Sequence, residues 1–238
     1  MDLQWLLATP VAHRGLHDLA AGRPENSRAA FAQAVEHGFP IELDVQLSAD
    51  SQAVVIHDPD LRRLAGLSRR VRQMTAAELT AVVLDGTDQR IPTLKEVLGD
   101  VAGRVPLLID LKSDRGSPVA RVVLSELGGY RGRVALQDFN PYSLWVLRRA
   151  GCVHAVGQVS GLLHGAPAPV RPVLRSMATN AVTRPDFLNV ELASLPNRAV
   201  TFWWRRGVRT LAWTANSRAD ALRAATLADN YLFSGFVP

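Results

Sequence analysis

The sequence predicts an α/β fold, a (β/α)8 TIM barrel with a short antiparallel hairpin arm after the second strand. Short apolar segments typical of strands alternate with segments of helical spacing along the chain. The length of 238 residues and the apolar share of 47% suit a single barrel domain over residues 1–238. A doubly wound open sheet is the alternative. The strands are expected at 11–13, 41–47, 105–112, 133–138, 154–159, 187–191, 209–214 and 231–234.

The first strand–helix–strand unit has clear boundaries in the sequence. Residues 11–13 form a short strand that ends at His13, before a loop rich in glycine, proline and aspartate. Ser27 is a typical N-cap, and apolar residues recur after it at helical spacing until Gly38 stops the helix. The strand 41–47 should therefore lie parallel to the first.

The segment after the second strand is too close to it for a helical crossover. Only the turn 49–52 separates the two, so residues 53–57 should fold back antiparallel as a hairpin. Counting through this turn places His57 opposite Asp44, within about one residue.

Beyond the hairpin, residues 59–103 have the pattern of helices and loops. Thr75-x-x-Glu78 and Thr93-x-x-Glu96 are capping-box patterns, and each opens a short helix. Further helices are expected at 141–150, 172–180, 196–206 and 217–227. Residues 161–172 are expected to form a loop that either faces the substrate or only connects two elements.

Composition limits the partners and the compartment. The formal net charge is +5, and every basic residue except Lys95 and Lys112 is an arginine. Because these arginines form no block and accompany no nucleic-acid module, the charge favours an anionic small-molecule substrate over nucleic acid. The single Cys152 excludes an internal disulfide and a thiolate metal site. With no signal peptide and no apolar span of about 18 residues, we expect a cytoplasmic protein without stable membrane insertion.

Two acidic residues stand together on the second predicted strand. Glu42 and Asp44 alternate with apolar neighbours, so a strand places both carboxylates on one face with Cα atoms roughly 6.5 Å apart. Such a pair needs a counter-charge, and Mg²⁺ or Ca²⁺ prefers carboxylate oxygens. The alternative is a structural ion pair of these acids with Arg14.

Other polar residues fall at the C-terminal ends of the predicted strands, where barrel active sites form. Asp110 adds a third carboxylate from the next barrel strand, and Lys112 follows on the same face, either facing the site or forming only a salt bridge with Asp110. The residues at strand ends are His13, Glu42, Asp44, Asp110, Lys112, Gln137 and Trp213.

Three carboxylates, two histidines and two cationic side chains suit displacement at phosphorus. A metal, Arg14 and Lys112 would stabilise charge on the non-bridging oxygens, while His13 and His57 exchange protons with the attacking and leaving oxygens. Histidine suits both proton transfers near neutral pH.

Seven short motifs follow one another over nearly the whole chain: His13-Arg14-Gly15, Pro24-Glu25-Asn26-Ser27, Glu42-Leu43-Asp44-Val45, Val54-Val55-Ile56-His57-Asp58, Ile91-Pro92-Thr93-Leu94, Asp110-Leu111-Lys112, and Trp213-Thr214 with Asn216. In this order they resemble the glycerophosphodiester phosphodiesterase family, within the phospholipase-C-like barrel phosphodiesterases. Each motif alone is weakly specific, whereas the ordered set is strongly specific.

The resemblance implies an enzyme that hydrolyses glycerophosphodiesters to glycerol 3-phosphate and an alcohol and requires Ca²⁺ or Mg²⁺. It implies that Arg14 and Lys112 hold the phosphate and that Glu25 orients the site. Whether a cyclic phosphate forms first stays open. The assigned residues are His13, His57 and Arg14 for catalysis, Glu42, Asp44 and Asp110 for the metal, and Lys112, Glu25, Gln137 and Trp213 for the substrate.

The chain departs from the family pattern at three positions and in one length. Asp110 stands where the family usually has the longer glutamate, and Gln137 begins a segment where a serine–phenylalanine pair is usual. The last strand lacks the usual closing aspartate. Because only 52 residues separate His57 from Asp110, the insertion of larger relatives is absent or very short, which predicts a more open site.

Two other functions stay open. A barrel of the same fold could act on lysophospholipids or sphingolipids, since Trp203 and Trp204 form a candidate exposed edge. A non-catalytic barrel that binds a phosphodiester is suggested by the departures at Asp110 and Asp138. The sequence predicts neither the head group, nor the cation, nor the oligomeric state.

Overall fold

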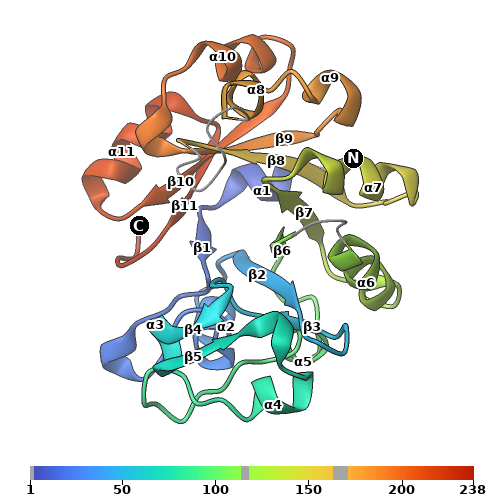
Figure 1. Cartoon of the computed structure of the whole chain (residues 1–238). Helices are drawn as coiled ribbons and strands as arrows, with labels where there is room; N and C mark the ends of the chain where they lie inside the picture. Colours follow the sequence, from blue (N-terminus) through green and yellow to red (C-terminus); the bar gives the residue numbers. More distant parts are fainter. Residues whose placement is uncertain (1–2, 114–117, 163–170) are drawn as a thin grey trace. The chain divides into compact units, whose positions relative to one another are not determined.

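The computed structural model describes residues 3–113, 118–162 and 171–238, and it divides into two compact units. One unit comprises residues 12–134, and the other comprises residues 1–11 and 135–238. The parallel strands β1, β2 and β6 to β11 follow one another along the chain, and helical segments separate successive strands (Figure 1). The fold is therefore the predicted (β/α)8 barrel. That the whole chain is one domain stays a prediction.

The unit of residues 12–134 is built on β2, which has a parallel strand on each side. His13 of β1 lies beside Glu42, and Asp44 lies beside Asp110 of β6. The predicted hairpin arm is confirmed, because β3 is antiparallel to β2 and pairs Val55 with Val45. The strands of this unit are β1 (Val11–His13), β2 (Ile41–Leu47), β3 (Ala53–Val55), β4 (Asp60–Leu61), β5 (Leu67–Arg70) and β6 (Leu107–Leu111).

Helices α2, α4 and α5 of this unit begin where the sequence predicts caps. The Ser27 side chain accepts a hydrogen bond from the Ala30 backbone N–H, and capping boxes form at both Thr75 and Thr93. Helix α6 was not predicted from the sequence. The helices are η1 (Leu19–Ala21), α2 (Arg28–Glu36), α3 (Arg62–Ala65), η2 (Val71–Gln73), α4 (Ala76–Thr80), α5 (Leu94–Val101) and α6 (Pro118–Leu127).

The segment between β3 and α5 contains a small sheet that was not predicted. Strands β4 and β5 pair antiparallel, and α3 packs against both (Figure 1). Leu61, Leu64, Val71 and Leu79 form a buried apolar cluster with Val54 of β3. This cluster anchors the segment to the hairpin arm, so the loop after β3 is held by a hydrophobic core.

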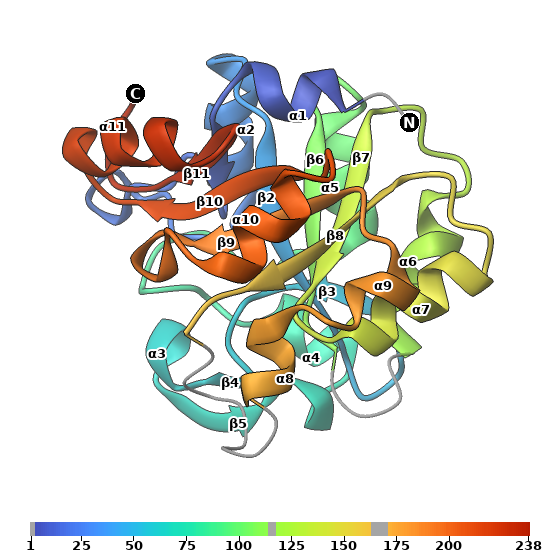
Figure 2. The ribbon, with the colours of Figure 1, turned by 90° about the horizontal axis from the view of Figure 1, so that it is seen from above.

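The second unit carries β7 to β11, all parallel to their neighbours among these strands. The predicted helix 172–180 is two helices, and Met177 between them has a positive φ of 54°. Figure 2 shows α11 lying beside β10 and β11. The elements are α1 (Gln4–Ala8), β7 (Val134–Asp138), α7 (Pro141–Arg149), β8 (Ala155–Ser160), α8 (Arg171–Ser176), α9 (Asn180–Thr183), β9 (Phe187–Glu191), η3 (Leu192–Ser194), α10 (Arg198–Trp204), β10 (Arg209–Ala215), α11 (Arg218–Leu227) and β11 (Asn230–Phe233).

The N-terminal helix α1 belongs to this second unit and was also not predicted. The Asn230 side-chain amide donates to the carbonyls of Leu6 and Thr9, which ties the helix to the start of β11. All five tryptophans of the chain lie in this unit. In the described part of the chain, no helix has the length and apolar character needed to cross a membrane.

Candidate active site

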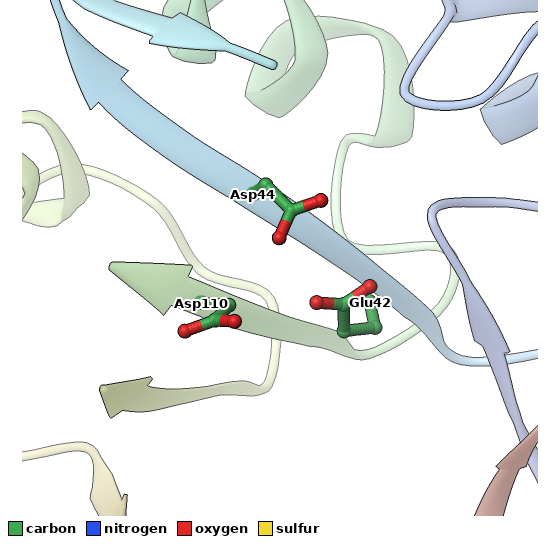
Figure 3. A group of neighbouring side chains, drawn as sticks. All are labelled: Glu42, Asp44 and Asp110. Atoms are coloured by element: carbon green, nitrogen blue, oxygen red, sulfur yellow. The ribbon is translucent and has the colours of Figure 1, made fainter. Parts of the chain in front are cut away.

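Three carboxylates meet on the adjacent strands β2 and β6. Register alone brings them together, because Glu42 and Asp44 are two residues apart on β2 and Asp110 is the partner of Asp44 on β6. Figure 3 shows the three side chains turned toward one another. One oxygen from each lies within 4.8 Å of the others, and all three residues are buried. This is a compact set of oxygen donors.

Two cationic side chains compensate the buried carboxylates. Lys112 Nζ lies 2.8 Å from Asp44 Oδ1 and 2.6 Å from Asp110 Oδ2, and Arg14 Nε lies 3.3 Å from Asp44 Oδ2. The two ion pairs that the sequence allowed as alternatives, Arg14 with an acid of β2 and Lys112 with Asp110, are thus present. These pairs do not balance the negative charge, because three acids face only two cations. In addition, the buried Asp110 Oδ1 accepts no hydrogen bond from the described residues.

The pKa values of these groups differ with their surroundings. Burial raises the pKa of Glu42 well above its usual value, and the nearby Asp44 and Asp110 raise it further. Burial also raises the pKa of Asp110 against the opposing effect of Lys112. For Asp44, Lys112 and Arg14 outweigh burial, so its pKa is low. For Lys112, Asp110 and Asp44 outweigh burial, so its pKa is high. Asp44 is therefore the most firmly ionised of the three acids.

His13 lies at the end of β1, beside the carboxylates. Its Nε2 is 4.0 Å from Glu42 Oε2. Burial, followed by the charge of Arg14, lowers its pKa to about 3. The His13 imidazole is therefore neutral near pH 7.

The turn after His13 depends on the residues Arg14 and Gly15. Arg14 has a positive φ of 60°, and its backbone N–H donates to Glu42 Oε2 at 2.9 Å. Gly15 has a φ of 81°, and a Cβ there would lie 2.9 Å from Phe31 Cδ1. The glycine thus lets the turn press against α2 while Arg14 Nη1 donates to Glu25 Oε1 at 2.7 Å.

His57 reaches the site through the hairpin arm, as predicted. The Ile56 backbone N–H donates to the Asp44 carbonyl, so His57 lies one residue beyond the point opposite Asp44. The Gln46 side-chain amide lies 2.8 to 2.9 Å from the carbonyl oxygens of Ile56, His57 and Asp58. The His57 Nδ1 is 2.7 Å from Asp58 Oδ1. Gln46 and Asp58 thereby fix the backbone and the ring of His57.

Two residues at the site were missed as site residues in the sequence. Asn26 is buried, donates from Nδ2 to Asp44 Oδ2 at 2.8 Å and accepts from the Asp44 backbone N–H at 3.2 Å. Arg63 hydrogen-bonds to both Asp58 and Glu25. Asn26 belongs to the motif Pro24-Glu25-Asn26-Ser27, and its position before the N-cap Ser27 could have indicated a role at the site. For Arg63, one arginine among many, the sequence offered no signal.

Gln137 and Trp213 belong to the second unit. Gln137 is buried and accepts a hydrogen bond from Asn189 Nδ2 at 3.0 Å. The Trp213 ring packs edge-on against Phe139, and its buried Nε1 has no hydrogen-bond partner among the described residues. Their assignment to substrate binding stays a prediction. Most of the predicted loop 161–172 lies outside the described residues.

A family model described as "Glycerophosphoryl diester phosphodiesterase family" matches residues 13–232. A glycerophosphodiester phosphodiesterase of Caldanaerobacter subterraneus is 31% identical over 228 residues, which cover 90% of this chain and 88% of that protein. A lysophospholipase D of Rattus norvegicus is 35% identical over 133 residues, which cover 50% of this chain and 41% of that protein.

Solved structures share the fold. A phosphodiesterase from Oleispira antarctica, solved in complex with the product sn-glycerol-3-phosphate, superposes with a TM-score of 0.80 and 22% identity. The superposition covers 96% of this chain and 93% of that one.

Proposed function

The chain belongs to the glycerophosphoryl diester phosphodiesterase family, and from that membership we propose that it hydrolyses glycerophosphodiesters to sn-glycerol 3-phosphate and an alcohol. In this proposal the reaction uses a divalent cation and the histidines His13 and His57. The observation that supports it best is the buried carboxylate set of Glu42, Asp44 and Asp110, flanked by His13 and Lys112.

The donor set fits a hard divalent cation. Three carboxylates offer oxygen atoms close together, and the buried Asp110 Oδ1 has no hydrogen-bond partner among the described residues. Ca²⁺ and Mg²⁺ both prefer such ligands, so Glu42, Asp44 and Asp110 would hold either ion. When bound, the cation neutralises charge that develops on the non-bridging phosphate oxygens.

Arg14 and Lys112 supply the positive charge that binds the phosphodiester. Both side chains are mostly buried, where charge interactions are weakly screened. Glu25 orients the Arg14 guanidinium through the 2.7 Å hydrogen bond to its Nη1. The planar guanidinium of Arg14 can then donate two hydrogen bonds to one phosphate, whereas Lys112 acts as a point charge.

The two histidines exchange the protons of the reaction. One accepts the proton of the attacking hydroxyl group, and the other donates a proton to the oxygen that leaves as the alcohol. A new P–O bond forms as the bond to the leaving alcohol breaks. Asp58 fixes the orientation of the His57 ring at Nδ1, which leaves Nε2 for proton transfer. Whether water or the glycerol 2-hydroxyl attacks first stays open.

The test measures release of sn-glycerol 3-phosphate from glycerophosphocholine. We expect His13→Ala and His57→Ala each to lower kcat by about 10²-fold or more, with the fold unchanged by circular dichroism. Excess EDTA should stop the reaction, and added Mg²⁺ or Ca²⁺ should restore it. Near-wild-type activity of His13→Ala would remove the assigned mechanism, and full activity in EDTA would remove the cation.

A second candidate keeps the site and changes the substrate to a lysophospholipid. The partial match to the rat lysophospholipase D favours it. Turnover of glycerophosphocholine and lysophosphatidylcholine by the same preparation separates the two. We also propose that Gln137 and Trp213 contact the substrate, so Trp213→Ala should raise KM more than it lowers kcat.

A further inference from the structure

The last turn of helix α10 exposes two aromatic side chains. Phe202 and Trp204 are 47% and 55% exposed. Val200 of the same helix is buried in an apolar cluster with Leu188 and Val190. Trp203 packs against this cluster. Because the inner residues already supply the core contacts of the helix, the outward rings have no comparable role in the packing of this unit.

Positive charge surrounds the Phe202 ring. Arg198, Arg205 and Arg206 line a hollow of about 560 Å³ on this face, and the Arg206 guanidinium stacks over the Phe202 ring at 3.5 Å. No carboxylate is among the described residues that line the hollow. In the sequence, no acidic residue stands between Glu191 and Asp220. The face around Phe202 therefore combines an exposed aromatic ring with strong positive charge.

We propose that this face docks the protein peripherally on an anionic phospholipid surface. Arginines complement lipid phosphates, and Phe and Trp side chains favour the boundary between head groups and acyl chains. An anionic lipid surface offers partners for both the arginines and the aromatic side chains. The proposal goes beyond the hydrolytic activity and does not depend on it.

The experiment measures co-sedimentation of the full chain with vesicles. We expect binding to mixed phosphatidylglycerol–phosphatidylcholine vesicles that weakens with salt, and little binding to phosphatidylcholine alone. The double variants Phe202→Ala/Trp204→Ala and Arg205→Glu/Arg206→Glu should each lower the partition coefficient by about tenfold or more. All four side chains are exposed, so these variants should keep the wild-type circular dichroism.

Matched control variants show whether binding depends on this face or on aromatic residues and positive charge anywhere on the protein. Tyr142→Ala/Trp145→Ala removes another exposed aromatic pair, and Arg131→Glu/Arg133→Glu makes the same change in net charge elsewhere. Both controls should bind as the wild type does. Equal losses in controls and test variants would overturn the proposal, as would unchanged binding of the test variants. Self-association without vesicles that is lost in the Phe202→Ala/Trp204→Ala variant would assign the face to a second copy instead.

An independent observation concerns Arg63 in the unit of residues 12–134. Its Nε donates to Asp58 Oδ2 at 2.7 Å, and its Nη1 and Nη2 donate to the two oxygens of Glu25 at 2.8 and 2.7 Å. The other oxygen of Asp58 contacts His57, and Glu25 also accepts from Arg14. One guanidinium thus joins the partners of two assigned catalytic residues.

We infer that Arg63 is a positioning residue that holds His57 and Arg14 in register with each other. These two residues stand on separate loops, after β3 and after β1, and the bridge from Asp58 through Arg63 to Glu25 connects them. Only the planar fork of arginine can donate to both carboxylates in this way. The inference rests on the proposed function, in which His57 and Arg14 act on the substrate.

The test compares kcat and KM of Arg63→Met and Arg63→Lys on glycerophosphocholine. We expect kcat to fall about 10- to 100-fold in both variants, with a smaller change in KM. Guanidinium ion added to Arg63→Ala should restore part of kcat, which a purely structural defect would not allow. In an Asp58→Asn background, Arg63→Met should cause little further loss, since both changes break the same bridge.

The outcomes separate this inference from the proposed function. An active wild type with unchanged kcat in Arg63→Met, or with losses that multiply in the double variant, overturns only the positioning role. A wild type that does not hydrolyse glycerophosphodiesters overturns both. Arg63 is half exposed, so its variants should fold.

Discussion

Asn26 is the residue on which the orientation of Asp44 depends. It has a positive φ of 56°, a conformation that asparagine tolerates better than most residues. Its side chain makes two hydrogen bonds with Asp44, one of them to a charged oxygen. Since Asp44 also contacts Lys112 and Arg14, its carboxylate is held on several sides.

Replacing Asn26 by alanine should therefore be costly. Losing a buried hydrogen bond to a carboxylate, together with the strain at positive φ, should lower the free energy of unfolding by about 2–4 kcal/mol. Urea denaturation measures this value. The control is Asn216→Ala, an exposed asparagine, which should change stability by less than about 0.5 kcal/mol. Equal effects of the two substitutions would contradict the role given to Asn26.

The site residues were predictable from the sequence where strand geometry positions them. Glu42, Asp44 and Asp110 follow from alternation and parallel register, and His57 follows from the length of one turn. Arg63 was not predictable, because its role depends on a segment that folds back over many residues to meet Glu25. A long-range contact of this kind leaves no local pattern in the sequence.

At the scale of elements, the two capping boxes define the starts of α4 and α5. The Thr93 hydroxyl accepts from the Glu96 backbone N–H, and the Glu96 carboxylate accepts in return from the Thr93 backbone N–H. Thr93→Ala should lower the free energy of unfolding by about 1 kcal/mol and the Tm by about 2–4 °C. Differential scanning calorimetry measures both, with Ser125→Ala on the exposed side of α6 as a neutral control. An unchanged Tm for Thr93→Ala would show that the cap is dispensable.

The elements missed in the sequence share a physical reason. Helix α6 is rich in valine, which favours strands, although its buried Val119, Val123 and Leu127 recur at helical spacing. Strand β5 is exposed along its whole length, so it shows no alternation of apolar and polar residues. The strand propensity of valine therefore hid helix α6, and the lack of alternation hid strand β5.

At the scale of the whole molecule, the Arg14–Glu25–Arg63 bridge should make stability depend on pH. Burial alone would raise the pKa of Glu25, but hydrogen bonds from Arg63 and Arg14 outweigh it, so the pKa is lowered from 4.5. A lowered folded-state pKa means that this stabilisation is complete above about pH 4.5 and is lost as the pH falls through the folded-state value.

The comparison of wild type with Glu25→Gln measures this contribution. We expect the difference in unfolding free energy to be constant between about pH 7 and 5 and to shrink below about pH 4.5. Urea denaturation at a series of pH values gives the curve. A difference that stays the same down to pH 3 would mean that the Glu25 charge does not stabilise the fold.

The distribution of tryptophans between the two units gives the chain a built-in reporter. Tryptophan fluorescence reports only on residues 1–11 and 135–238, because Trp5, Trp145, Trp203, Trp204 and Trp213 all lie there. Far-ultraviolet circular dichroism sees the helices of both units. If the chain is one cooperative domain, the two signals should follow a single unfolding curve, and curves that separate would show that residues 12–134 unfold on their own.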